Sequence, residues 1–277
     1  MALIPDETDV LVIGGGASGI PAAIGAARAG ARVVLVEEDP TPGGAAVDQF
    51  VSMPGGGPRS GVVAEMLQRL ENRYALTPRP VDRWWDFWYL PSDMMRVGVE
   101  MLTAEPNLTL LCPARVNRLT TTEADGRTRV NGALVPDMTG RERAIRAHVV
   151  IEATGSGRLA EDVGCEARYG EDAKHDFNES IAPDERSELV QQCTWMYISQ
   201  RIGSLAGDDD WFPKGLEPGH GGSKSSHRQK CDDPQAGMYL HWGCRVDCRD
   251  TRDPIALAES QREGLAQMKP DLDELRE

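Results

Sequence analysis

The sequence predicts an α/β fold that opens with a parallel β-α-β unit, carries an inserted antiparallel meander and continues into a partial second domain. Three observations support this prediction. Two short apolar runs, residues 10–13 and 33–36, flank an Ala-rich stretch of helical character, and glycines gather in the turn after the first run. From residue 108 the pattern changes to short strands separated by turn residues. Short apolar runs of this kind are typical of strands buried on both faces of a parallel sheet.

The turn after the first strand contains the pattern G-x-G-x-x-G, formed by Gly14, Gly16 and Gly19. In a Rossmann-like unit the first glycine permits a tight turn, and the second lets backbone amides approach a pyrophosphate. The third glycine lets the helix pack closely on the strand. The helix N-terminus, with Ala17 and Ser18, favours negative charge because its N–H groups and its dipole point toward the ligand. We therefore predict a dinucleotide site at this turn.

An acidic residue, Glu37, ends the second strand and completes the pattern. A carboxylate there accepts hydrogen bonds from the hydroxyls of an adenosine ribose and repels a 2′-phosphate. Glu38 and Asp39 are alternatives for this role, but the expected end of the strand favours Glu37.

The segments between the second strand and the end of the first domain are predicted from local periodicity. Helices are expected over residues 61–74 and 92–104. Short strands are expected over 107–112, 114–123, 128–136 and 142–150, with a turn at Ala124–Gly126. A further buried strand, 148–153, leads into a Gly-rich loop and a short helix. We predict a first domain over 1–165, with insertions at about 59–147, and a partial substrate or cap domain over 166–277.

The β-α-β unit, the meander and the segment IEATGSGRLAEDVG at 151–164 together resemble the FAD-dependent oxidoreductases of the two-dinucleotide-binding-domain class, related to glutathione reductase. Within that class the chain looks most like the group simply called FAD-dependent oxidoreductases, whose members carry an ATGDGDLA-like segment after the meander. Segments 165–201 and 239–265 resemble later parts of the same group, so the resemblance covers most of the chain.

This resemblance implies FAD as the cofactor and adds site residues to the glycine motif and Glu37. The backbone amide and carbonyl of Val116 match the position that pairs with the adenine edge, although Val116 also fits plain strand core. Thr154 and Gly155 match the loop beside the nucleotide, although Gly155 also fits a simple turn. Gly43 and Gly44 fall where the chain approaches the flavin.

Members of this family normally return to the flavin domain near their C-terminus with another glycine-containing strand and helix. Here residues 254–277 predict only an amphipathic helix and a charged tail. We therefore expect a C-terminally shortened chain. It is a fragment or the product of an early-terminated gene, a shortened variant of the fold, or a chain whose flavin site is completed by a partner chain or a second copy.

The leading functional hypothesis is an FAD-dependent oxidoreductase that transfers a hydride from a small substrate to the flavin. Alternatives are a thiazole synthase-like protein that uses a dinucleotide, a simple NAD-binding oxidoreductase, which the meander disfavours, and a non-catalytic nucleotide-binding subunit. No catalytic residue is identified. Histidine ordinarily has a pKa near neutral pH, so His241 is a candidate acid or base, but the sequence favours a packed or surface histidine at this position.

Composition excludes several classes of partner. The net charge is −14 and the isoelectric point is near 4.9, which argues against nucleic acid as a partner.

The sequence shows no membrane span and no signal peptide, so we expect a cytoplasmic protein with reduced thiols. Two His/Cys groupings lack a standard ligand spacing, so no metal site is predicted; they are His241, Cys244 and Cys248, and His220, His227 and Cys231.

Overall fold

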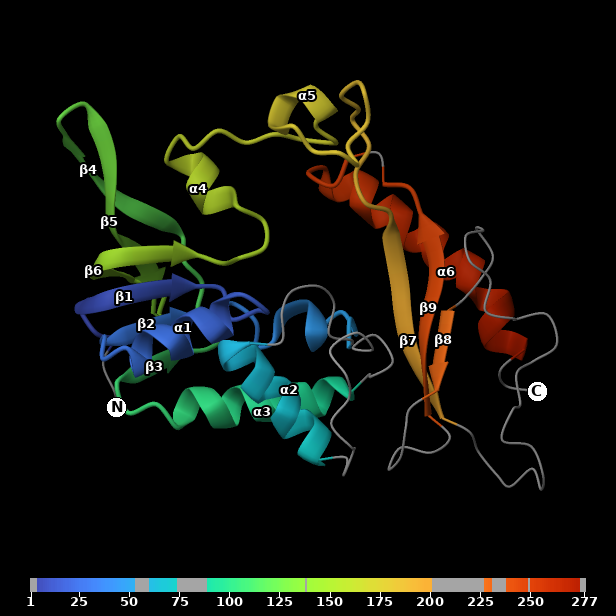
Figure 1. The fold of residues 1–277 in the computed structure, drawn as a ribbon, viewed down its shortest axis with the longest axis horizontal. Helices are drawn as coiled ribbons and strands as arrows, with labels where there is room; N and C mark the ends of the chain where they lie inside the picture. Colours follow the sequence, from blue (N-terminus) through green and yellow to red (C-terminus); the bar gives the residue numbers. More distant parts are fainter. Residues whose placement is uncertain are drawn as a thin grey trace. The chain divides into compact units, whose positions relative to one another are not determined.

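A computed structural model describes residues 4–52, 60–73, 89–137, 139–200, 227–230, 238–248 and 250–274. The chain divides into two compact units, Met1–Glu166 and Ala167–Glu277. Figure 1 labels the helices and strands of both units and colours them along the sequence.

The first unit contains one six-stranded sheet in the order β3-β2-β1-β6-β5-β4. Its parallel part begins with the predicted β-α-β unit, β1 (Glu7–Ile13), α1 (Gly19–Arg28) and β2 (Val33–Val36). All four residues of β2 are buried, as expected for a strand inside a parallel sheet. The remaining elements are η1 (Gly44–Ala46), α2 (Gly61–Arg73), α3 (Pro91–Thr103), β3 (Leu108–Leu111), β4 (Arg118–Ala124), β5 (Arg127–Pro136), β6 (Glu142–Glu152) and α4 (Arg158–Asp162).

Two details of the predicted meander are wrong. β3 pairs in parallel with β2 and belongs to the Rossmann-like part, not to the meander. The two strands expected over 142–150 and 148–153 are one continuous strand, β6. Its first half pairs antiparallel with β5, and residues Arg146–Glu152 pair in parallel with Glu7–Ile13 of β1. The meander therefore extends the same sheet instead of forming a separate one.

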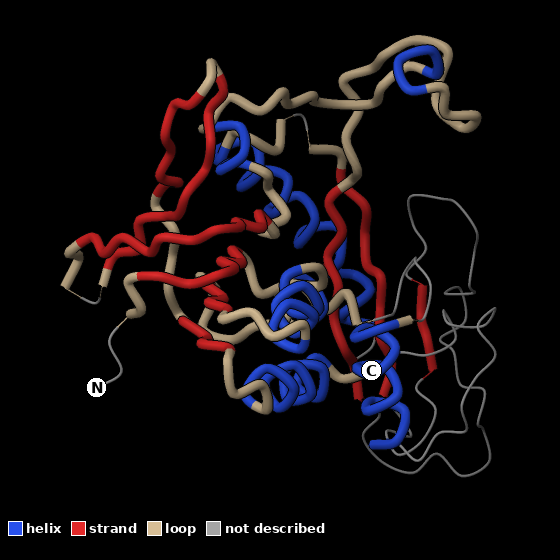
Figure 2. The backbone as a smooth tube through the Cα atoms, turned by 60° about the vertical axis from the view of Figure 1, so that its left-hand side comes forward, coloured by secondary structure: helices blue, strands red, loops and turns tan. Residues whose placement is uncertain are grey.

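Helices α1, α2 and α3 cover one face of this sheet, as Figure 2 shows from the side. Their apolar faces, including Ile24, Leu70 and Met101, pack with Val12 and Leu35 of the sheet. The other face forms a second core in which β1 and β2 meet the meander strands and α4. The parallel strands β1 and β2 therefore have helices packed on one side and side chains of the meander and α4 packed on the other, as expected for an α/β layer structure.

The predicted helices occur with small shifts of their ends. α2 is described to Arg73, and Tyr74, its expected last residue, lies outside the described residues. α3 begins at Pro91 with Leu90 as its N-cap, one residue before the expected Ser92. Proline suits the first turn because its missing N–H has no helical partner there.

The second unit contains α5 (Lys174–Phe177) and a three-stranded antiparallel sheet in the order β7-β9-β8, formed by β7 (Cys193–Gln200), β8 (His227–Lys230) and β9 (Met238–Val246). The long helix α6 (Pro254–Glu274) packs on β7 and β9, and the indole N–H of Trp195 donates to the carbonyl of Gln261 (3.1 Å). α6 continues through Pro270 into the segment expected to be a tail, so that expectation is wrong.

Within the described ranges, no helix has both the length and the apolar character needed to cross a bilayer.

Candidate nucleotide site at the carboxyl end of the parallel strands

The glycine turn between β1 and α1 is shaped by two glycines that the fold itself requires. Gly14 has a φ of +98°, and a Cβ on it would lie 2.4 Å from the carbonyl oxygen of Ala153. A Cβ on Gly19 would lie 1.7 Å from the carbonyl oxygen of Gly14. Both positions exclude a side chain because β1, α1 and the end of β6 meet there.

Gly16 differs from these two glycines. A Cβ on Gly16 would have only the Cα of Gly44 as a near neighbour, at 3.8 Å, so the protein itself leaves room at this position. Gly16 lines a cavity, and Ala17 and Ser18 beside it are exposed. Helix α1 has no acidic side chain in its first turn and no side-chain hydrogen bond from its N-cap Ser18. Because Gly16, Ala17 and Ser18 line the cavity, the N-terminal end of α1 faces it. This end carries the positive end of the helix dipole, which suits a phosphate.

Glu37 is held rigidly behind the glycine turn. Only 5% of it is exposed, and its two carboxylate oxygens accept the backbone N–H groups of Gly15 and Asp39, the latter at 2.7 Å. Its own backbone is fixed to the loop after β3, because its N–H donates to Leu111 and its carbonyl accepts from Ala114. The carboxylate is thereby oriented before any ligand binds, and it retains lone pairs for further donors.

The loop that contains Gly43 and Gly44 packs against the glycine turn. The N–H of Gly43 donates to the carbonyl of Gly15 (2.8 Å), and a Cβ on Gly44 would lie 3.0 Å from the Cα of Gly16. The resemblance predicted that this segment approaches the flavin. In the structure Gly44 and Ala45 of this segment form the wall of the cavity beside the glycine turn, and the position of the flavin stays a prediction.

A third wall is formed by the loop after β6. The backbone and hydroxyl of Thr154 both donate to the carboxylate of Glu152, and Gly155 and Ser156 follow toward α4. Arg158, the first residue of α4, donates from Nη2 to the carbonyl oxygen of Val116 at 2.8 Å. One of the two backbone groups of Val116 that were expected to contact adenine is therefore already bound by a side chain.

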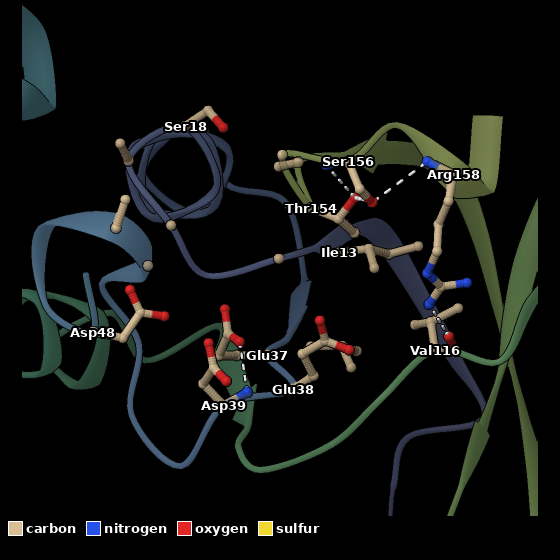
Figure 3. A pocket seen from close by; sticks show the side chains of 18 of the residues that line it. Ile13, Ser18, Glu37, Glu38, Asp39, Asp48, Val116, Thr154, Ser156 and Arg158 are labelled. Carbon is tan, nitrogen blue, oxygen red and sulfur yellow. Dashed lines mark hydrogen bonds between the residues drawn. The ribbon is translucent and has the colours of Figure 1, made fainter. Parts of the chain in front are cut away.

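These loops enclose a cavity of about 560 Å³, shown in Figure 3. Its volume lies within the range usual for small-molecule sites. Nine of the predicted site residues line it: Gly14, Gly16, Ala17, Ser18, Glu37, Gly44, Val116, Thr154 and Gly155. Gly19 and Gly43 are not among its lining residues; they lie behind it and shape the turn.

Further residues shape the cavity beyond those predicted from sequence. Gly15 does not line it, but its N–H donates to the carboxylate of Glu37, and a Cβ on Gly15 would lie 2.9 Å from that carboxylate. Asp48 and Arg158 line the cavity as well. Burial raises the pKa of Asp48, and its hydrogen bond with Asp39 adds to the rise. Asp39 and Glu38, weighed only as alternatives to Glu37, also line the cavity, so its walls carry four carboxylates.

The other sequence candidates lie in the second unit. His241 is 1% exposed, its ring stacks on Tyr197 at 4.4 Å between centroids, and its Nε2 lies 2.7 Å from the hydroxyl of Ser199. Cys244 donates to a carbonyl of α6. Among the described residues, no group of three or more His, Cys, Asp or Glu side chains is arranged to hold a metal ion. His220 and Cys231 lie outside the described residues.

Comparisons with known proteins agree with this geometry. Residues 9–276 match the family described as FAD dependent oxidoreductase. Over 50 residues the chain is 58% identical to hydroxyneurosporene desaturase of Rhodobacter capsulatus, and the aligned part covers 18% of this chain and 10% of the desaturase.

Solved structures share the fold at low sequence identity. The L-proline dehydrogenase from P. horikoshii has a TM-score of 0.53 at 12% identity, covering 96% of this chain and 79% of that one. The myxobacterial chondrochloren halogenase, described as a variant of FAD-dependent halogenases, has a TM-score of 0.52 at 15% identity, covering 96% of this chain and 60% of that one. These likenesses confirm the predicted fold class.

Proposed function

The chain belongs to the FAD dependent oxidoreductase family and has FAD as its cofactor, and from this premise we propose that it oxidises a small organic substrate by hydride transfer to the flavin. FAD supplies the redox chemistry when it is bound, and the protein supplies binding, orientation and electrostatics. The predicted family and cofactor are confirmed by the family match, whereas the substrate and the hydride step are proposals.

The observation that best supports binding of FAD in this cavity is the difference between the three motif glycines. Gly14 and Gly19 are required by the fold, whereas Gly16 has free space on its Cα and faces the cavity. A glycine that the protein does not need for its own packing is explained by the close approach of a ligand to its backbone. The pyrophosphate would then lie at the N-terminus of α1.

Glu37 would bind the adenosine ribose. Its carboxylate is already oriented by two backbone N–H groups, so little ordering is needed when the ribose hydroxyls donate to it. The same negative charge disfavours a nucleotide with a 2′-phosphate. The cavity volume of about 560 Å³ and the polar groups at its two ends fit the adenosine diphosphate part of FAD.

The binding site is tested with Gly16→Ala and Gly16→Val. The Cβ of either side chain fits the protein without clash, so thermal unfolding of the alanine variant should match the native chain, whereas FAD binding should weaken progressively from alanine to valine. Gly25→Ala is the control, because a Cβ on Gly25, in helix α1 after the glycine turn, has no neighbour within 4 Å, and Gly25 does not line the cavity. Unchanged FAD affinity in both Gly16 variants would place the cofactor elsewhere.

The reaction is tested by anaerobic mixing of the FAD-loaded chain with a panel of small alcohols, amines and amino acids. Loss of the visible absorbance of oxidised flavin identifies a substrate, and a deuterium isotope effect on that rate supports hydride transfer. Retention of FAD with no reduction by any compound of the panel would favour the non-catalytic alternative.

A further inference from the structure

The end of the cavity that would receive the purine base can be located from the other contacts. In the proposed function the phosphates lie at the glycine turn and the ribose lies at Glu37. The loop after β3 is tied directly to Glu37, since the N–H of Ala114 donates to the Glu37 carbonyl at 2.6 Å. The base, attached to the ribose on the side away from the phosphates, therefore meets the wall formed by Val116 and Arg158 (Figure 3).

Arg158 is fixed in this wall by its surroundings. It begins α4, and the next residue, Leu159, is completely buried in the core that covers the sheet. Its guanidinium donates to the carbonyl of Val116 at 2.8 Å. Among the cavity residues that the structure describes, Arg158 is the one cationic side chain, and it faces a lining with four carboxylates.

The bond between Arg158 and Val116 changes which hydrogen-bond donors and acceptors the wall presents to the edge of a purine. Adenine presents a 6-amino donor, whereas a 6-oxopurine such as hypoxanthine presents an acceptor at the same position. The carbonyl of Val116 would be the natural acceptor for the amine and keeps one lone pair for it, but the guanidinium bound to the same oxygen brings N–H donors to that side of the wall as well. Arginine at a base edge pairs best with the acceptors of a 6-oxopurine, and glutamine pairs best with adenine.

We propose that Arg158 determines base specificity at this site by making the base end rich in donors, so that the chain discriminates weakly between 6-aminopurine and 6-oxopurine nucleotides. The proposal rests on the proposed function, because it needs the nucleotide part of FAD in this cavity.

The test uses ADP and IDP as competitors of FAD, with flavin fluorescence as the readout. These two nucleotides share every group except those that distinguish the 6-aminopurine from the 6-oxopurine. The native chain should bind them with affinities within about threefold of each other. Arg158→Gln should raise the preference for ADP about tenfold, because an amide can accept from the 6-amino group and donate to the ring nitrogen beside it. Arg158→Ala, which frees the Val116 carbonyl, should change the ratio in the same direction.

Two controls separate this role from charge and from structure. Arg115→Gln removes the same charge from the neighbouring loop, where Arg115 pairs with Glu38 at 3.4 Å without lining the cavity, so the ADP-to-IDP ratio should not change. Arg158→Lys keeps the charge and the donors, so its ratio should remain close to the native one. A purely structural role of Arg158 would instead lower both affinities equally, which would overturn the proposal.

A native chain that already prefers ADP by more than tenfold, with a ratio unaffected by Arg158→Gln or Arg158→Ala, would overturn the inference and leave the FAD site intact. Absence of binding by FAD, ADP and IDP alike would overturn the proposed function and this inference together.

Discussion

Replacing Glu37 by glutamine tests how the site is organised before a ligand binds. Glu37 is 5% exposed, and each oxygen of its carboxylate accepts one backbone N–H, from Gly15 and from Asp39. Glutamine keeps the shape of the side chain but has one carbonyl oxygen and one amide NH2 group. The backbone N–H of either Gly15 or Asp39 must then face another donor. Loss of a buried hydrogen bond to a charged acceptor costs about 2 kcal/mol. For a unit of this size we expect a decrease in melting temperature of about 4–8 °C.

The same substitution should weaken FAD binding separately from its effect on stability. The ribose hydroxyls lose a charged acceptor, which costs about 2 kcal/mol of binding free energy, or about 30-fold in affinity. FAD titration by flavin fluorescence gives the affinity, and thermal unfolding without FAD gives the stability. Both effects should appear in Glu37→Gln because, in the proposed site, the carboxylate would bind the ribose as well as the protein backbone.

Glu38→Gln is the matched control for this prediction. Its side chain is 55% exposed and forms an ion pair with Arg115 at 3.4 Å, so we expect the free energy of unfolding to change by less than about 0.5 kcal/mol and FAD affinity to change little. Equal losses of affinity in the two variants would refute the assignment of the ribose to Glu37. A normal melting temperature for Glu37→Gln would refute the role of its backbone hydrogen bonds.

Three further predictions follow from single contacts. Gly19→Ala should destabilise the chain and abolish FAD binding, because its Cβ would lie 1.7 Å from the Gly14 carbonyl oxygen; a normal melting temperature would contradict this. Hydrogen bonds from Arg32 lower the pKa of Asp9 from 3.8 to about 2, so Asp9 stabilises the fold above its ordinary pKa, and this contribution disappears as the pH falls toward 2. Asp9→Asn should therefore unfold at a lower temperature than the native chain at neutral pH and at the same temperature near pH 2, as measured by circular dichroism. Burial, together with a neighbouring thiol, raises the pKa of Cys193, so its alkylation by iodoacetamide should be slow at neutral pH and accelerate only above its ordinary pKa of 9.0; a rate equal to that of the unfolded chain would contradict this.

The β-α-β unit could be predicted from sequence because all of its signals are local. Each strand is a short apolar run, the turn needs glycine for steric reasons at Gly14 and Gly19, and Glu37 follows directly from the end of β2. The predicted fold class, which rests on these local signals, is confirmed by solved structures that share the fold. The precise assignment of each residue to a part of FAD stays a prediction.

The strand pairing after residue 107 could not be predicted with the same accuracy. β3 has the composition of a meander strand, and only its pairing with β2 shows that it belongs to the parallel part. β6 alternates exposed and buried residues around Ile145 and Ala147, whereas Val150–Glu152 at its end are all half-buried, because its two halves have different partners. Periodicity reports burial and does not identify the neighbouring strand, so one strand appeared as two.

The parallel register explains why the site contains more than its local motif. Ile13 at the end of β1 is opposite Val36 of β2 and Glu152 of β6. The residues that follow these three positions therefore leave the sheet at one edge, which is where parallel sheets place their ligand sites. Gly14 and Glu37 could be found within one β-α-β unit. Arg158 reaches the same cavity only because β6 pairs with β1, so its contact with Val116 depends on long-range pairing that a local pattern does not reveal. The nucleotide specificity of this chain is therefore expected to depend on residues outside the motif that identifies its family.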